Sequence, residues 1–82
     1  MGTVPTDLSG RDVSKVLSKA NYERRSRTGS HVVFGKEVEG EDNRRVTVPL
    51  QDRIPIGTLR SIARQAGAND FESFCRWIDE NR

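Results

Sequence analysis

A glycine turn that runs directly into a β-branched strand constrains the fold of this chain more than any other segment. It reads Arg27-Thr28-Gly29-Ser30-His31-Val32-Val33-Phe34 and carries the only histidine. Gly29 supplies the backbone freedom that a tight turn needs, and the apolar run behind it favours an extended strand. Neighbouring side chains of a strand point to opposite faces, so His31 lies on the open face if Phe34 enters the core.

The length of 82 residues predicts one domain with a small core. Residues 1–6 contain a glycine and a proline but no periodicity, so we expect a disordered leader, with the domain spanning 7–82. No apolar run approaches the ~20 residues that span a bilayer, and the N-terminus lacks the apolar core of a signal peptide. We therefore expect a cytoplasmic protein that makes no contact with a membrane.

Basic residues outnumber acidic ones most strongly between Arg11 and Lys36. The region from Arg11 to Lys36 holds seven bases and two acids, although the formal net charge of the whole chain is +2. Such a region is typical of a surface that binds a polyanion such as nucleic acid, but it is also typical of a charged surface that only contacts solvent.

Two features argue against a metal or cofactor. The acids at 37–42 lack the spacing of a calcium loop, so we interpret them as a solvated hairpin loop. Cys75 is the only cysteine, which excludes an internal disulfide and a cysteine-only metal site. We expect no metal and no cofactor.

Hydrophobic periodicity predicts a helix followed by three strands in the first 49 residues. Ser9 is the expected N-cap of the helix, and Asp12 completes a capping box. The basic segment after the helix is interpreted as an edge strand, since charge protects sheet edges. The predicted segments are a helix over 10–20, a strand over 22–27, a strand over 30–38, a polar loop over 39–43 and a strand over 44–49.

Two more helices are predicted after the strands. Pro55 suits the first turn of a helix, apolar residues then repeat at helical spacing, and Gly67 is the expected C-terminal cap. Asn69 with Glu72 predicts the capped start of a short final helix that folds back onto the body. Its apolar stripe includes Phe71, Phe74 and the neighbouring Trp77, which we interpret as core residues rather than platforms for base stacking.

The predicted fold is α+β. The order is α-β-β-β-α with an extra C-terminal helix, which gives a three-stranded antiparallel sheet with helices on one face. Two helices cover only one face of so small a sheet, so the other face is left for solvent or a ligand.

Four segments of the chain resemble the HicA family of mRNA-cleaving toxins, in the same order and with the same spacing. The block from Ile56 to Gly67 is the most family-specific of them. The similarity covers about Asp7 to Gly67. The four segments are Leu8-Ser9-Gly10-Arg11-Asp12-Val13, Gly29-Ser30-His31-Val32-Val33-Phe34, Arg45-Val46-Thr47-Val48-Pro49 and the block over 56–67.

The resemblance implies a double-stranded-RNA-binding-like fold and a metal-independent endoribonuclease, an mRNA interferase that halts translation. It also implies a cognate HicB antitoxin and places the catalytic histidine of the family at His31. Members often carry a second histidine where this chain has Val32, and many have one soon after the Val-Pro pair, where it has Leu50 and Gln51.

The chemistry of RNA cleavage supports the same residue. Cleavage needs a base for the proton of a 2′-hydroxyl, and histidine suits this task because its unperturbed pKa, ~6.5, lies close to cellular pH. Arginine suits the charged phosphate because one guanidinium can hold two oxygens. Gly29 and Ser30 are candidates for shaping the site, and the acid for the leaving group stays open. The arginine candidates for RNA binding are Arg24, Arg25, Arg27, Arg45 and Arg60.

Two other functions remain open at the level of the sequence. The chain can be a non-catalytic RNA-binding module of the double-stranded-RNA type, in which His31 only contacts RNA or packs. It can also be a protein-interaction adaptor, for which the basic region is incidental. Loss of growth arrest in His31→Ala separates the toxin from both.

Overall fold

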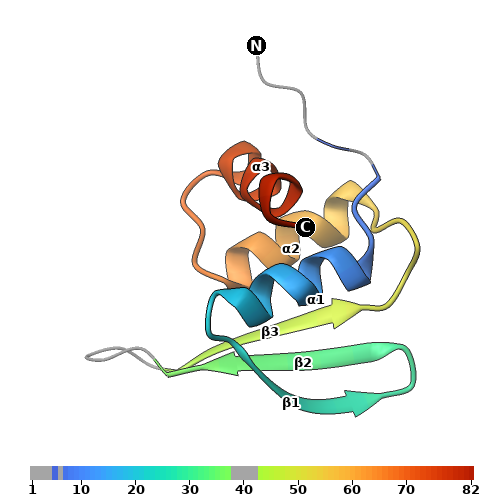
Figure 1. The fold of residues 1–82 in the computed structure, drawn as a ribbon, viewed down its shortest axis with the longest axis vertical. Coiled ribbons are helices and arrows are strands. Elements are labelled where there is room, and N and C mark those ends of the chain that lie inside the picture. Colours follow the sequence, from blue (N-terminus) through green and yellow to red (C-terminus); the bar gives the residue numbers. More distant parts are fainter. Residues whose placement is uncertain (1–4, 6, 38–42) are drawn as a thin grey trace.

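The chain folds into three helices and three strands in the order α-β-β-β-α-α (Figure 1). The computed structural model describes residues 5, 7–37 and 43–82. The elements are α1 (Gly10–Lys19), β1 (Glu23–Thr28), β2 (His31–Lys36), β3 (Arg44–Pro49), α2 (Ile56–Gln65) and α3 (Phe71–Asn81).

The three strands form one antiparallel sheet in the order β1-β2-β3. His31 pairs with Thr28 on one side and with Pro49 on the other, so it stands at the end of the central strand. Between Arg24 and Ser26 the register of β1 shifts by a bulge. The predicted three-stranded antiparallel sheet is confirmed.

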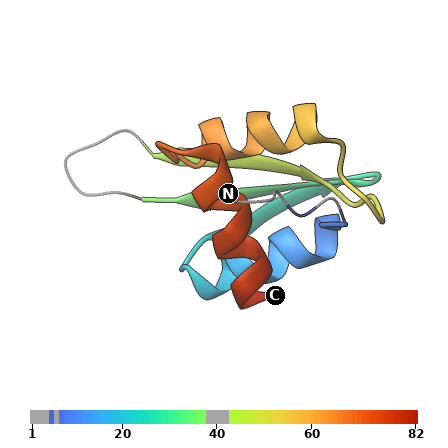
Figure 2. The same cartoon turned by 90° about the horizontal axis from the view of Figure 1, so that it is seen from above.

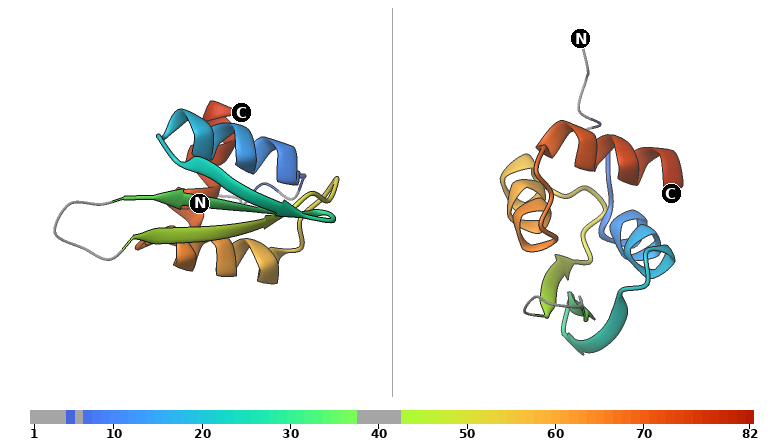
Figure 3. Two further views of the ribbon diagram at one scale, coloured as in Figure 1. Left: turned by 90° about the horizontal axis from the view of Figure 1, so that it is seen from below. Right: turned by 90° about the vertical axis from the view of Figure 1, so that its left-hand side faces the viewer.

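The helices form two layers above one face of the sheet. Figure 2 looks onto these layers, where α3 crosses over both α1 and α2. Figure 3 shows that α1 and α2 lie against the sheet and that α3 lies on their far side. No described helix covers the opposite face of the sheet. The α+β, double-stranded-RNA-binding-like fold is confirmed.

The core lies between the sheet and the two helix layers. Val32 and Phe34 point into it from β2, which confirms the predicted alternation of that strand. The same core takes apolar side chains from every helix, none of them more than 5% exposed. These side chains are Val13, Val16, Leu17, Leu59, Ile62, Ala63, Phe74, Cys75 and Ile78.

The start of α1 is held against the end of β3. Ser9 Oγ accepts from the Asp12 backbone N–H at 3.0 Å and the Asp12 carboxylate accepts from the Ser9 N–H at 3.1 Å, which confirms the capping box. Gly10 N donates to Gln51 O at 2.8 Å. A β-carbon on Gly10 would lie 2.8 Å from Leu50 Cα, so the close approach requires glycine.

The ends of several elements differ from the prediction by one or two residues. The first helix ends at Lys19, with Ala20 as its C-cap. The strand β1 begins at Glu23, where its pairing with β2 begins, and ends at Thr28. Because Ser30 belongs to the turn, β2 begins at His31. Pro55 has an extended backbone and is the N-cap of α2, not part of its first turn.

Three predictions fall mainly outside the described residues. They are the disordered leader over 1–6, the end of the second strand at Val38, and most of the loop over 39–43. The strand β2 ends at Lys36, so the prediction that Glu37 belongs to it is wrong.

Two predictions about α3 are wrong. Asp70, not Asn69, caps the helix, because the Asp70 carboxylate accepts from the Ser73 hydroxyl at 2.6 Å and from the Ser73 N–H at 3.0 Å. These bonds hold the pKa of Asp70 below its usual value. Trp77 is 37% exposed and does not lie in the core, whereas Phe74 beside it is buried.

Gly67 has φ +76°, which confirms it as the glycine that ends α2. None of the helices in the described part of the chain is long and apolar enough to cross a membrane.

Candidate active site

The turn between β1 and β2 consists of Gly29 and Ser30. Gly29 has φ +58°, and glycine at the first position of a two-residue hairpin is typical of a type II′ turn. Arg27 Nε donates to Gly29 O at 3.1 Å, and Leu50 N donates to Ser30 O at 2.6 Å. The turn is therefore fixed from both sides, by its own strand and by the residue that follows β3.

His31 directly follows this turn and is exposed. Its neighbour Val32 is buried under the helices, so the imidazole points to the uncovered face of the sheet. Within the described residues the His31 side chain makes no hydrogen bond or ion pair, and no carboxylate orients it. The imidazole is thus open to solvent and to a ligand on that face.

Arg25 and Arg45 lie on the same face as His31, but further along the sheet. Arg45 pairs with Gly35, and a β-carbon on Gly35 would lie 2.7 Å from Arg25 Nε, so the Arg25 side chain covers that glycine. Gly35 is four residues from His31, about 13 Å at the rise of a strand. The two arginines line a hollow of about 260 Å³.

Arg24 and Arg27 lie on the other side of the sheet. Arg24 pairs with Phe34 and Arg27 pairs with Val32, and paired residues point to the same face, here the one that α1 covers. Both arginines are exposed. The structure therefore divides the four strand arginines between the two faces.

Between α1 and β1 lies a groove of about 540 Å³, which we call the α1–β1 groove. Arg11 and Ser14 line it from the helix, Arg24 and Arg27 line it from the strand, and the Gly29–Ser30 turn forms one end. Asp52 is the one carboxylate among its lining residues.

Sequence reasoning did not find Arg11 or Ser14 as site residues. The sequence identifies Arg11 only as a residue on the polar face of the first helix. Its approach to β1 depends on tertiary packing.

Arg60 is the arginine candidate that lies outside the sheet. It is an exposed residue of α2, and its guanidinium carbon lies 4.5 Å from the centroid of the Phe71 ring. It therefore faces α3 and not the sheet.

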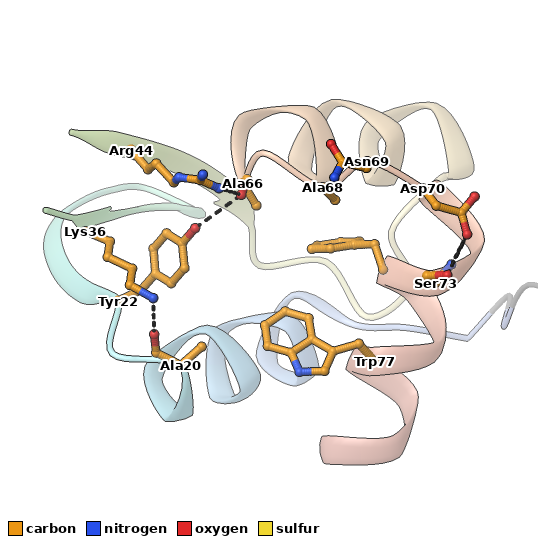
Figure 4. A pocket seen from close by; sticks show the side chains of 11 residues that line it. Ala20, Tyr22, Lys36, Arg44, Ala66, Ala68, Asn69, Asp70, Ser73 and Trp77 are labelled. Atoms are coloured by element: carbon orange, nitrogen blue, oxygen red, sulfur yellow. Dashed lines mark hydrogen bonds between the residues drawn. The ribbon is translucent and has the colours of Figure 1, made fainter. Parts of the chain in front are cut away.

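A separate hollow of about 580 Å³ lies between α3 and the other ends of the strands (Figure 4). Tyr22, Phe74 and Trp77 line it together with Lys36 and Arg44. Tyr22, Lys36 and Arg44 each donate to a backbone carbonyl, and Lys36 Nζ also lies 5.3 Å from the centre of the Tyr22 ring. None of the site residues predicted from the sequence lines this hollow.

Across the described ranges, no three His, Cys, Asp or Glu side chains are grouped so that they could hold a metal ion. Cys75 is buried in the core, and this burial raises the pKa of its thiol.

One comparison with known proteins gave a match. The search of curated proteins gave no match. A family model described as the HicA toxin of bacterial toxin–antitoxin systems matches residues 10–68, which include the capped helix, the sheet, the Gly-Ser-His turn and α2. The chain therefore belongs to the HicA family, the toxins of bacterial toxin–antitoxin systems, whose members are paired with an antitoxin.

Proposed function

We propose that this toxin is an endoribonuclease that cleaves mRNA, with His31 as the general base, and so inhibits translation. The observation that carries the proposal is the position of His31. It is exposed on the uncovered face, beside a fixed glycine turn, and its side chain makes no hydrogen bond or ion pair within the described residues. A HicB-type antitoxin that covers this face would block the activity.

The reaction is attack of a 2′-hydroxyl on the adjacent phosphorus. An imidazole nitrogen of His31 accepts the hydroxyl proton as the O2′–P bond forms. The P–O5′ bond breaks, which leaves a 2′,3′-cyclic phosphate, and the departing O5′ takes a proton from water. The imidazole then returns its proton to solvent. Proton transfer suffices for each step, so we expect cleavage to continue in the presence of a chelator.

The charged phosphates need cationic partners. Arg27 stands closest to His31 along the chain, and its Nε bond to Gly29 O leaves its two terminal nitrogens for phosphate oxygens. Arg25 and Arg45, further along the same face as His31, suit neighbouring phosphates. Arg24 and Arg60 would contact parts of the RNA that lie farther from the scissile phosphate.

Gly29 and Ser30 would shape the site through the backbone. Gly29 allows the tight turn that directly precedes His31, and Ser30 O holds Leu50.

The test is induced expression of the wild-type chain and of His31→Ala in a bacterial host. We expect the wild type to arrest growth and to produce new RNA ends, and His31→Ala to do neither at the same level of soluble protein. Circular dichroism of the purified variant checks that it is folded. Growth arrest by a well-folded His31→Ala would refute His31 as the catalyst.

A non-catalytic RNA-binding module is the second candidate function. The observation in its favour is that the sequence holds no second histidine and that no described carboxylate touches His31. This module would bind RNA without producing new ends, in the wild type as in His31→Ala.

A further inference from the structure

The α1–β1 groove has the chemistry of a phosphate site. Arg11, Arg24 and Arg27 line it from two different elements, and Asp52 is the one carboxylate that opposes them. The side chains of Arg11 and Arg24 make no hydrogen bond or ion pair to any described residue. Three guanidinium groups of like charge around a hollow repel one another, and an anion bound between them offsets this repulsion.

Ser14 gives independent support for a polar ligand in this groove. Its Oγ is shielded from solvent and has no hydrogen-bond partner in the described part of the chain. Buried polar atoms are normally paired, so an unpaired hydroxyl in the lining of a binding groove calls for an explanation. By rotation about one bond a serine hydroxyl can turn to donate to a phosphate oxygen.

The groove and His31 lie on opposite faces of the sheet and share the Gly29–Ser30 turn. Arg24 and Arg27 point to the helix-covered side, and the imidazole points to the uncovered side. A nucleic acid that reaches both must bend around the edge of the sheet at this turn. A single strand bends easily over a few nucleotides, whereas a duplex is stiff over that length.

We propose that the α1–β1 groove binds the phosphates of a single-stranded RNA whose scissile bond lies across the turn at His31. The proposal rests on the proposed ribonuclease function and names its substrate class. It also adds Arg11 and Ser14 as RNA-binding residues. A duplex would reach His31 or the groove, but not both.

The test measures RNA binding in the His31→Ala background, so that the RNA stays intact. The groove variant is Arg11→Gln/Arg24→Gln, and the control variant Arg64→Gln/Arg76→Gln removes the same charge from exposed positions on α2 and α3. The probes are a single-stranded RNA of about 12 nucleotides, within the usual range of site sizes, and the same sequence as a blunt duplex.

We expect the groove variant to bind the single strand at least tenfold more weakly than its parent. The slope of log affinity against log salt should fall in magnitude by about 1.4, because each phosphate that an arginine no longer neutralises removes about 0.7. The control should keep both the affinity and the slope, and the duplex should bind the parent more weakly than the single strand. Equal losses of affinity in the groove and control variants, or a duplex that binds as tightly as the single strand, would overturn the proposal.

Ser14→Ala provides a variant whose folding is not at risk, because it removes a hydroxyl that has no partner among the described residues. We expect a melting temperature that is unchanged or higher, together with single-strand binding that is several-fold weaker. Unchanged binding would remove Ser14 from the site.

Cleavage assays on an otherwise wild-type chain distinguish failure of the groove from failure of the proposed function. Cleavage that depends on His31 but not on Arg11 and Arg24 would refute RNA binding in the groove and leave the ribonuclease function standing. Weaker RNA binding in the groove variant of a chain that never cleaves RNA would refute the ribonuclease and leave the groove as the site of a binding module.

Discussion

Gly10 sets the distance between α1 and the end of β3, and with it the position of the turn that precedes His31. A β-carbon at this position would meet the backbone of Pro49 and Leu50, and backbone cannot move aside as a flexible side chain can. We expect Gly10→Ala to lower the free energy of unfolding by about 1–3 kcal/mol, the usual cost of overpacking. Urea denaturation followed by circular dichroism measures this loss.

Gly57 provides the matched control for this substitution. It also lies in the first turn of a helix, but a β-carbon there would meet no atom within 4 Å. Gly57→Ala should therefore stabilise the protein by about 0.5–1 kcal/mol, because alanine loses less backbone entropy than glycine in a helix. Equal effects of the two substitutions would show that the contact with β3 does not restrict Gly10.

At the scale of elements, Asp12 links the start of α1 to the end of the chain. Its carboxylate caps the helix through Ser9 and accepts from Arg82 at 3.1 Å. Partial burial acts to raise the pKa of Asp12, but the hydrogen bonds from Ser9 and Arg82 outweigh it and hold the pKa below the ordinary 3.8. The ionised carboxylate is thus favoured in the folded state.

This shift predicts a loss of stability in acid. A pKa that is lower in the folded state contributes stability above the unfolded value, and the contribution disappears as the pH falls through the folded pKa. We expect Asp12→Asn to cost about 0.3–1 kcal/mol near neutral pH, a typical value for an acid in the first turn of a helix. The difference from the wild type should vanish well below pH 3.8. A difference that is constant with pH would contradict this account.

The third helix is a structural part of the domain, although it lies beyond the residues that the family model matches. Ile78 is fully buried in the common core, whereas Trp77 beside it is 37% exposed. Ile78→Ala should lower the free energy of unfolding by about 2–5 kcal/mol, and Trp77→Ala should cost less because its indole is only partly buried. A loss of less than about 1 kcal/mol for Ile78→Ala would mean that α3 is only loosely attached. Chemical denaturation of both variants measures the difference.

At the scale of the whole molecule, the sequence predicts the fold and one half of the site. The alternation of Val32 and Phe34 against His31 follows from the period of two in a strand, and it places the imidazole on the open face. The capping box and the glycine stop follow from local hydrogen bonding and backbone freedom. These features depend on residues close together in the chain, so they can be predicted directly from the sequence.

The other half of the site depends on tertiary structure. All six residues of β1 are exposed, so no apolar residue indicates which face each arginine takes. The bulge between Arg24 and Ser26 also interrupts the period of two, so that Arg24 and Arg27 share one face and Arg25 lies on the other, which spacing alone does not show. The approach of Arg11 to this strand follows from the packing of α1 on the sheet.

A substrate that extends over both faces should be cleaved more efficiently as it becomes longer. Phosphates in the α1–β1 groove supply binding energy far from the reacting bond, and such energy raises kcat/KM when it is used to position the scissile phosphate. We expect kcat/KM of the wild type to rise from a trinucleotide to a single strand of about 12 nucleotides. Arg11→Gln/Arg24→Gln should cleave the trinucleotide as well as the wild type and lose most of this rise.

The dependence on length separates a remote phosphate site from a general effect of charge. Arg64→Gln/Arg76→Gln removes the same two charges and should retain the rise, because neither residue lines the groove. If the groove variant cleaves both substrates equally slowly, its arginines act at the scissile phosphate or on the fold, and not on distant nucleotides. A rise that persists in the groove variant would place the remainder of the RNA on the open face, along Arg25 and Arg45. The bound RNA would then stop at the edge of the sheet and would not bend around it.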